Sequence, residues 1–81
     1  MDNSINIIGV LVKHPELNKL ELQDILTSYG CSIKTRLGLN DPEKDHYALI
    51  LLELTGDINE QENLIRSIEK LESVEVNRMS F

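Results

Sequence analysis

The chain has 81 residues, with eight Lys and Arg against fourteen Asp and Glu, which gives a net charge of −6. This length is typical of a single domain, here residues 1–81, and the negative charge argues against binding to nucleic acid or to an anionic membrane. With one cysteine, Cys31, no recognisable signal peptide and no apolar run long enough to span a membrane, we expect a reduced, cytoplasmic protein.

The first half of the chain predicts a strand, a helix and a second strand. Residues 5–12 are apolar and rich in β-branched side chains, which is typical of a strand. Pro15 suits the first turn of a helix, and apolar residues then recur at helical spacing as far as Tyr29. Gly30 is expected to cap this helix in the left-handed conformation. At residues 33–39 apolar and polar side chains alternate, which predicts a half-buried strand.

The second half predicts a strand, a helix and a last strand. After a charged, proline-containing turn, residues 47–54 form a strongly apolar run that predicts the third strand. Asp57 followed by Glu60 resembles a capping box at the start of a helix, and Asn59 with Glu62 offers a second register. A short alternating segment near the end of the chain predicts the final strand.

This β-α-β-β-α-β order is typical of an α+β, ferredoxin-like sandwich. Such a fold has a four-stranded antiparallel sheet of order 4-1-3-2, with both helices on one face. The first and third strands are then central, and both are apolar on their two faces, whereas a sheet with one wet face would alternate. We therefore expect an apolar stripe along the middle of the helix-free face.

Leaving such a stripe in water would cost about 25 cal/mol per Å² of apolar surface. The sequence therefore predicts a homodimer or higher oligomer that covers the helix-free face, joins sheet edges, or does both. We expect Ile8, Gly9 and Val10 of the first strand at this interface, together with Leu49 and Leu51 of the third. The alternative is a monomer whose central strands are simply apolar.

The only soft metal ligands are His14, His46 and Cys31. In the predicted topology the two histidines lie at one end of the sheet and the cysteine at the other, so one chain cannot gather them into a tetrahedral site. We interpret them as surface histidines and a partly buried cysteine, and we expect no resident metal or cofactor. A His14–His46 site completed across an interface is the alternative.

The candidate ligand-binding residues are Arg36, Gly38 and His14. Arg36 is expected on the helix-free face, where its fork-shaped cation could hold a carboxylate or a phosphate. Gly38 would allow a ligand or a second chain to approach closely. The interpretation that we favour for Arg36 itself is a salt bridge to an acidic neighbour such as Glu53 or Glu75, in the same chain or in another subunit. No nucleophile motif or glycine-rich phosphate loop is present, so we predict no catalytic residues.

Four segments, residues 5–10, 35–39, 48–52 and 71–76, resemble the iron-only hydrogenase system regulators. These are stand-alone ACT-like domains related in fold to the regulatory domain of the nickel-responsive repressor. The sharpest part of the resemblance is Arg36-x-Gly38. Family members often have a proline soon after this motif, whereas here it comes later, at Pro42. The repressor's pattern of metal-binding His and Cys is missing.

The resemblance implies an oligomeric regulatory or ligand-sensing module without catalytic activity, such as a transcriptional or hydrogenase-system regulator. Its expected partners are further copies of itself and a small-molecule effector or a partner protein. Alternatives are a purely structural subunit, an acylphosphatase-like hydrolase and a metal-handling protein. The hydrolase needs an anion cradle and an Asn in the first strand-to-helix loop, where Lys13 and His14 stand. The metal-handling protein needs paired cysteines.

Overall fold

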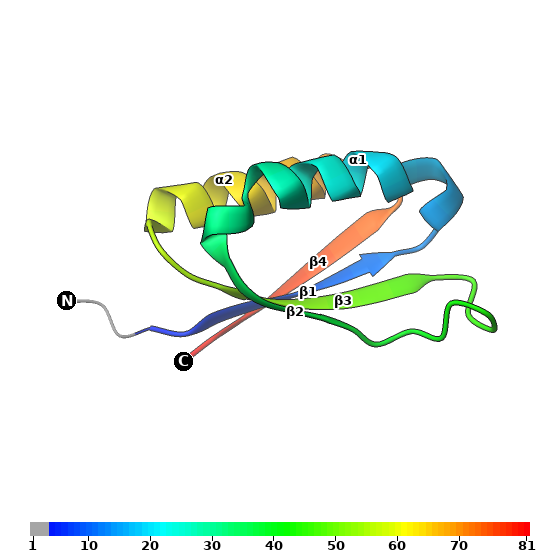
Figure 1. Ribbon diagram of the computed structural model, residues 1–81, viewed down its shortest axis with the longest axis horizontal. Helices are drawn as coiled ribbons and strands as arrows, with labels where there is room; N and C mark the ends of the chain where they lie inside the picture. Colours follow the sequence, from blue (N-terminus) through cyan, green and yellow to red (C-terminus); the bar gives the residue numbers. More distant parts are fainter. Residues whose placement is uncertain (1–3) are drawn as a thin grey trace.

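Each half of the chain contributes two strands and one long helix, and the computed structural model describes residues 4–81 (Figure 1). In chain order the elements are β1 (Asn6–Val12), α1 (Pro15–Ser28), the single turn η1 (Gly30–Ser32), β2 (Ile33–Gly38), β3 (Ala48–Leu54), α2 (Ile58–Glu69) and β4 (Val74–Ser80). Residues 1–3, on which the expectation of no signal peptide partly rests, lie outside this range. Neither helix in the described range has the length and hydropathy needed to cross a membrane.

The four strands form one antiparallel sheet of order β2-β3-β1-β4. This is the expected order 4-1-3-2 read from the other edge, so the ferredoxin-like topology is confirmed. Figure 1 shows α1 and α2 side by side on one face of the sheet, while the opposite face carries no helix. We call this second surface the helix-free face.

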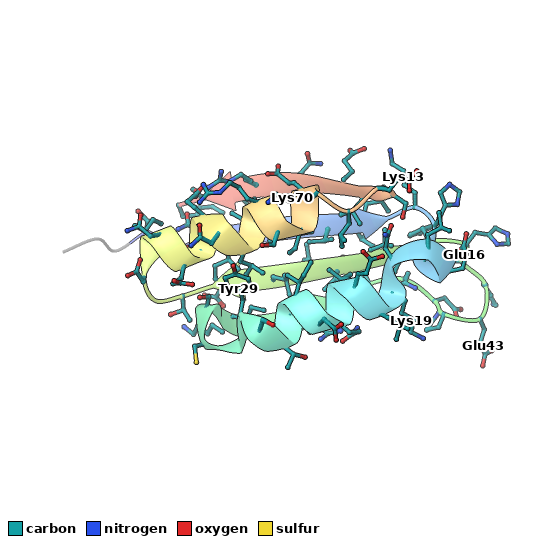
Figure 2. All side chains as sticks on the ribbon, turned by 90° about the horizontal axis from the view of Figure 1, so that it is seen from above. Lys13, Glu16, Lys19, Tyr29, Glu43 and Lys70 are labelled. Atoms are coloured by element: carbon teal, nitrogen blue, oxygen red, sulfur yellow. The ribbon has the colours of Figure 1, made fainter. Side chains whose placement is uncertain are left out.

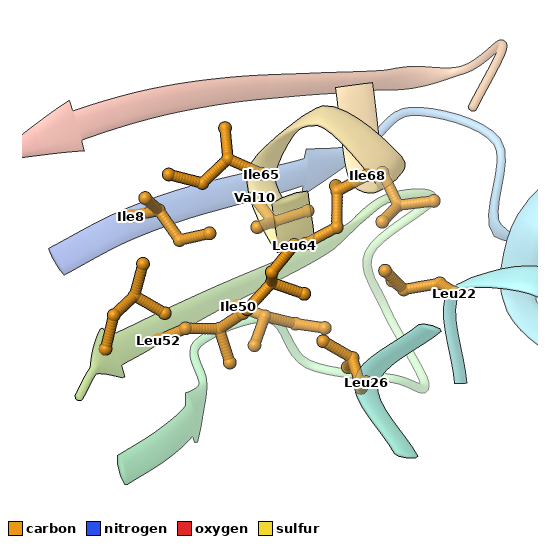
Figure 3. Packing of buried hydrophobic residues seen from close by; sticks show 11 residues of the cluster. Ile8, Val10, Leu22, Leu26, Ile50, Leu52, Leu64, Ile65 and Ile68 are labelled. Atoms are coloured by element: carbon orange, nitrogen blue, oxygen red, sulfur yellow. The ribbon is translucent and has the colours of Figure 1, made fainter. Parts of the chain in front are cut away.

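The hydrophobic core lies between the sheet and the two helices (Figure 3). Alternate residues of β1 and β3 point toward the helices, as the period of two in a strand requires. The helices supply the other side of the core from apolar residues at helical spacing. Its members are Ile8, Val10, Val12, Leu22, Leu26, Ile50, Leu52, Leu54, Leu64, Ile65 and Ile68.

A β-bulge in β2 decides which face its side chains reach. Ile33 lies opposite Leu54, but Thr35 lies opposite Glu53, so two steps along β2 match one step along β3. The extra residue is Lys34. Because one inserted residue exchanges the faces of everything after it, Arg36 moves to the helix-covered face. The expectation that Arg36 points to the helix-free face is therefore wrong.

The ends of the helices differ from expectation at one glycine. Gly30 does not cap α1 in the left-handed conformation but begins the turn η1, and the only residue with positive φ in the described range is Gly56, at 82°. Gly56 precedes Asp57, whose side chain accepts hydrogen bonds from the amides of Asn59 and Glu60. The first of the two predicted registers is thus the one that starts α2.

Candidate functional site

A cleft of about 810 Å³ lies at one end of the sheet, between the first turns of α1 and the β2–β3 hairpin. We call it the α1–hairpin cleft. It is of a size that commonly holds a small organic ligand. Its lining residues are Val12, Lys13, His14, Pro15, Glu16, Lys19, Leu22, Gln23, Arg36, Gly38, Asn40, Pro42, Asp45, His46, Tyr47, Ala48 and Ile50.

All three predicted ligand-binding residues line this cleft: Arg36, Gly38 and His14. The bulge explains the first two, because Arg36 pairs with Leu52 and Gly38 with Ile50, on the side of β3 that faces the helices. They therefore lie beside α1 and not, as expected, on the helix-free face. A Cβ built on Gly38 would meet no other atom within 4 Å, so the missing side chain leaves open space there.

The cleft is richer in basic side chains than the protein as a whole. Three of the eight Lys and Arg residues line it, namely Lys13, Lys19 and Arg36, but only two of the fourteen acidic residues, Glu16 and Asp45. Figure 2 shows Lys13, Glu16 and Lys19 at the same end of the molecule. Lys13 is paired with a carboxylate outside the cleft, Glu75, so the two lining cations that form no ion pair within residues 4–81 are Lys19 and Arg36.

Arg36 forms none of the ion pairs or side-chain hydrogen bonds found among residues 4–81. The two carboxylates proposed as its partners are engaged elsewhere. Glu53 lies 3.8 Å from the ammonium of Lys34 and accepts a 3.1 Å hydrogen bond from Thr35, both through side-chain atoms. Glu75 lies 3.4 Å from the ammonium of Lys13. Within one chain, the predicted salt bridge from Arg36 to Glu53 or Glu75 is therefore wrong.

The β2–β3 hairpin is shaped by its own polar side chains. The Asn40 side-chain oxygen accepts a hydrogen bond from the amide of Leu49 at 3.1 Å. The Asp41 carboxylate accepts one from the amide of Glu43 at 3.0 Å, and Asp45 accepts one from the amide of Asp41 at 2.7 Å. These carboxylates stabilise the turn that places Asn40 and Asp45 on the cleft wall.

The N-terminus of α1 forms the opposite wall. His14 occupies the N-cap position but its side chain makes no capping hydrogen bond, and Pro15 follows at the first helical position. The imidazole Nδ1 lies 3.4 Å from the Glu16 carboxylate. The first turn of a helix carries amides without intrahelical partners and a partial positive charge. At the wall formed by α1, this partial positive charge lies beside the Glu16 carboxylate of the same turn.

The two histidines lie at one end of the sheet, as expected, because both His14 and His46 line the cleft. Cys31 belongs to η1, which follows the far end of α1, and it is exposed and not partly buried as predicted. Within the described part of the chain, no group of three or more His, Cys, Asp or Glu side chains is placed to hold a metal ion.

The helix-free face is a second candidate surface, and it is mostly apolar. Leu49 and Leu51 lie on it and are only half-buried by the chain itself, beside Gly9 of β1. Ile8 and Val10 do not belong to it: each is 1% exposed and packs against the helices, so neither can reach a partner chain. By register and alternation, the apolar residues of this face are Ile5, Ile7, Leu11, Leu37, Leu39, Tyr47, Leu49, Leu51, Met79 and Phe81.

Sequence reasoning missed Lys19 as a member of the cleft. The signal was present, because Lys19 lies four residues after Pro15 and three before Leu22, which places the three on one helical face. Leu22 is buried in the core, so the residues beside it on this face were bound to lie near the sheet. What the sequence could not show is which hairpin side chains lie opposite them.

Comparison with known proteins shows the fold. No family model and no curated protein matches the chain. Among solved structures, it is similar to the uncharacterized protein TM1266 from Thermotoga maritima, with a TM-score of 0.82 and 20% identity over 98% of this chain and 99% of that one. It is also similar to the ACT domain of a GTP pyrophosphokinase of Chlorobium tepidum, with a TM-score of 0.71 and 14% identity over 93% and 96% of the two chains.

A third similar structure is the apo form of CPII from Thiomonas intermedia K12, a nitrogen regulatory PII-like protein. Its TM-score is 0.68, with 12% identity over 96% of this chain and 89% of that one. At these identities the likeness establishes an ACT-like, ferredoxin-like architecture. It does not identify any ligand-binding residue in this chain.

Proposed function

We propose that this protein is a non-catalytic, homo-oligomeric regulatory module that senses a small-molecule anion. The observation that carries the proposal is the guanidinium of Arg36, which lines a cleft of about 810 Å³ and has no acidic partner within residues 4–81. A cation left unpaired in a concave site is a ready point of attachment for a carboxylate or a phosphate.

The architecture supports a regulatory role over an enzymatic one. The similar structures include an ACT domain and a PII-like protein described as nitrogen regulatory. The narrower assignment, to a regulator of an iron-only hydrogenase system or of transcription, rests on the sequence resemblance around Arg36 and Gly38.

The helix-free face supports the oligomeric part of the proposal. Leu37 is 52% exposed, Met79 55% and Phe81 72%, and they flank the half-buried Leu49 and Leu51. Apolar surface of this extent on one side of a small domain favours a protein partner, and a second copy of the chain carries the matching surface. We infer that Gly9, Leu49 and Leu51 lie at the centre of this interface.

A thermal-shift screen tests the sensing role. Because a ligand that binds only the native state raises the melting temperature by mass action, at least one compound among amino acids, nucleotides and small organic acids is expected to do so. The Arg36→Ala variant should lose the shift. Arg66→Ala, which removes the same charge from the exposed side of α2, should keep it. The function is wrong if no compound shifts the wild-type protein, or if the protein hydrolyses a generic acyl phosphate well above the blank rate.

A further inference from the structure

The α1–hairpin cleft has more unpaired cationic groups than one carboxylate requires. Arg36 and Lys19 both line it, and neither takes part in an ion pair within the described residues. A guanidinium presents two parallel N–H donors to a pair of oxygens, and an ammonium binds a further oxygen as a point charge. Together they match the three terminal oxygens of a phosphate monoester, whereas a carboxylate has only two.

The first turn of α1 favours the same chemistry. The side chain of its N-cap residue, His14, makes no capping hydrogen bond, and Pro15 follows as the first residue of the helix. Both residues line the cleft. The other helix differs, because the Asp57 side chain caps α2 by accepting hydrogen bonds from two amides. Pro15 has no N–H, and the amide of Leu17 donates to the carbonyl of His14 at 2.9 Å. The first turn therefore offers a dianion the amide of Glu16 and the partial positive charge of the helix terminus.

Part of the remaining lining is apolar, beside the polar side chains of Glu16, Gln23, Asn40, Asp45 and His46. Val12, Leu22 and Ile50 are buried core residues that also line the cleft, and Ala48 continues this surface toward the hairpin. A bare inorganic anion would leave this part of the cleft unused. The ligand that fits both halves carries a phosphate at one end and an organic body with both apolar and polar groups at the other.

We propose that the α1–hairpin cleft binds a phosphate monoester of a heterocyclic body, with the size of a nucleoside monophosphate. Arg36 and Lys19 bind the phosphate, and the apolar surface around Leu22 and Ile50 receives the body. This inference rests on the proposed sensing function and names the class of ligand that the cleft senses.

Isothermal titration calorimetry at fixed ionic strength tests it with adenosine monophosphate, adenosine and inorganic phosphate as probes. The monophosphate is expected to bind about tenfold or more tightly than either fragment, because it fills both halves of the cleft. Equal affinity for the monophosphate and for adenosine would overturn the proposal. So would binding of an amino acid in place of all three probes, a result that leaves the sensing function standing.

Two variants test whether the ligand binds in the cleft. Arg36→Ala should weaken binding of the monophosphate by about tenfold or more, the usual scale for losing a charge-assisted bidentate contact, while Arg66→Ala should leave it unchanged. Gly38→Val changes no charge and puts two methyl groups into the empty space beside Arg36, so it should also weaken binding while the protein stays folded. Unchanged affinity in both Arg36→Ala and Gly38→Val would place the site elsewhere and overturn the proposal.

Discussion

At the scale of single residues, Asn18 of α1 is a buried polar side chain whose hydrogen bonds reach a distant part of the chain. Asn18 is 4% exposed, and its side-chain oxygen accepts a 3.0 Å hydrogen bond from the amide of Ser73 and another from the Ser73 hydroxyl. The same hydroxyl lies 3.3 Å from the carbonyl oxygen of His14. These contacts join the start of α1 to the segment before β4, and so they position the wall of the α1–hairpin cleft.

Replacing Asn18 by Ala should destabilise the fold by about 1–3 kcal/mol, because the buried amide of Ser73 would be left without an acceptor. Urea denaturation, followed by circular dichroism, measures this change. The matched control is Asn59→Ala in the exposed first turn of α2, where a change within about 0.5 kcal/mol is expected. Equal effects of the two substitutions would contradict a structural role for the Asn18–Ser73 contact.

At the scale of elements, the two helices begin in different ways. Asp57 caps α2 through its carboxylate, at 2.7 Å from the amide of Asn59, whereas the side chain of His14 makes no capping bond to α1. In the proposed binding site, the missing side-chain cap would leave the partial positive charge at the start of α1 available to a bound anion.

Asp57→Ala should therefore lower the free energy of unfolding by about 0.5–2 kcal/mol, the usual cost of losing an N-cap. His14→Ala removes no capping bond, so in the absence of ligand it should change stability by only a few tenths of a kcal/mol. Thermal unfolding of the two variants in parallel distinguishes them. A loss of stability in His14→Ala as large as in Asp57→Ala would show that His14 does cap α1.

Most of the elements could be predicted because each depends on a local pattern. The structure has strands where the apolar runs predict β1 and β3, and a helix where the spacing predicts α2. Asp57 caps that helix, as the capping pattern predicts. The face reached by Arg36 could not be predicted, because it depends on the bulge at Lys34, and a bulge is a relation between two strands. Without the bulge, strict alternation along β2 would place Arg36 on the helix-free face.

The candidate site could be predicted only in part, because residue types are visible in the sequence and contacts between elements are not. Arg36, Gly38 and His14 were identified by their residue types, and all three line the cleft. Their grouping with Lys19 comes from the packing of α1 beside the hairpin, and no spacing in the sequence encodes that contact. The error at Ile8 and Val10 has a related cause, because a strand that is apolar on both faces does not reveal which face the helices cover.

At the scale of the whole molecule, the sheet separates two surfaces. Its helix-covered side ends in the α1–hairpin cleft, and its helix-free face carries apolar side chains from both central strands together with Glu53 of β3. Gly9 stands in the middle of this face, and a Cβ added there would lie 3.7 Å from a methyl group of Leu51, an ordinary contact. The glycine is therefore not required by packing within one chain, and it leaves the centre of the face flat, as the proposed contact with a second copy would favour.

Leu51→Glu places a charge at the centre of the helix-free face without entering the core. It should dissociate the oligomer, because burying an unpaired carboxylate in an apolar interface is costly. Leu20→Glu is the matched control, since Leu20 is 80% exposed on the outer side of α1. Circular dichroism should show the same secondary structure for both variants.

Sedimentation velocity of the wild-type protein and these two variants at micromolar concentration is the most direct test that a second copy covers the helix-free face. The wild-type protein and Leu20→Glu should sediment with at least twice the chain mass of 9.2 kDa, and Leu51→Glu should sediment as a single chain. A wild-type protein that sediments at 9.2 kDa, or an oligomer that Leu51→Glu leaves intact, would contradict that claim.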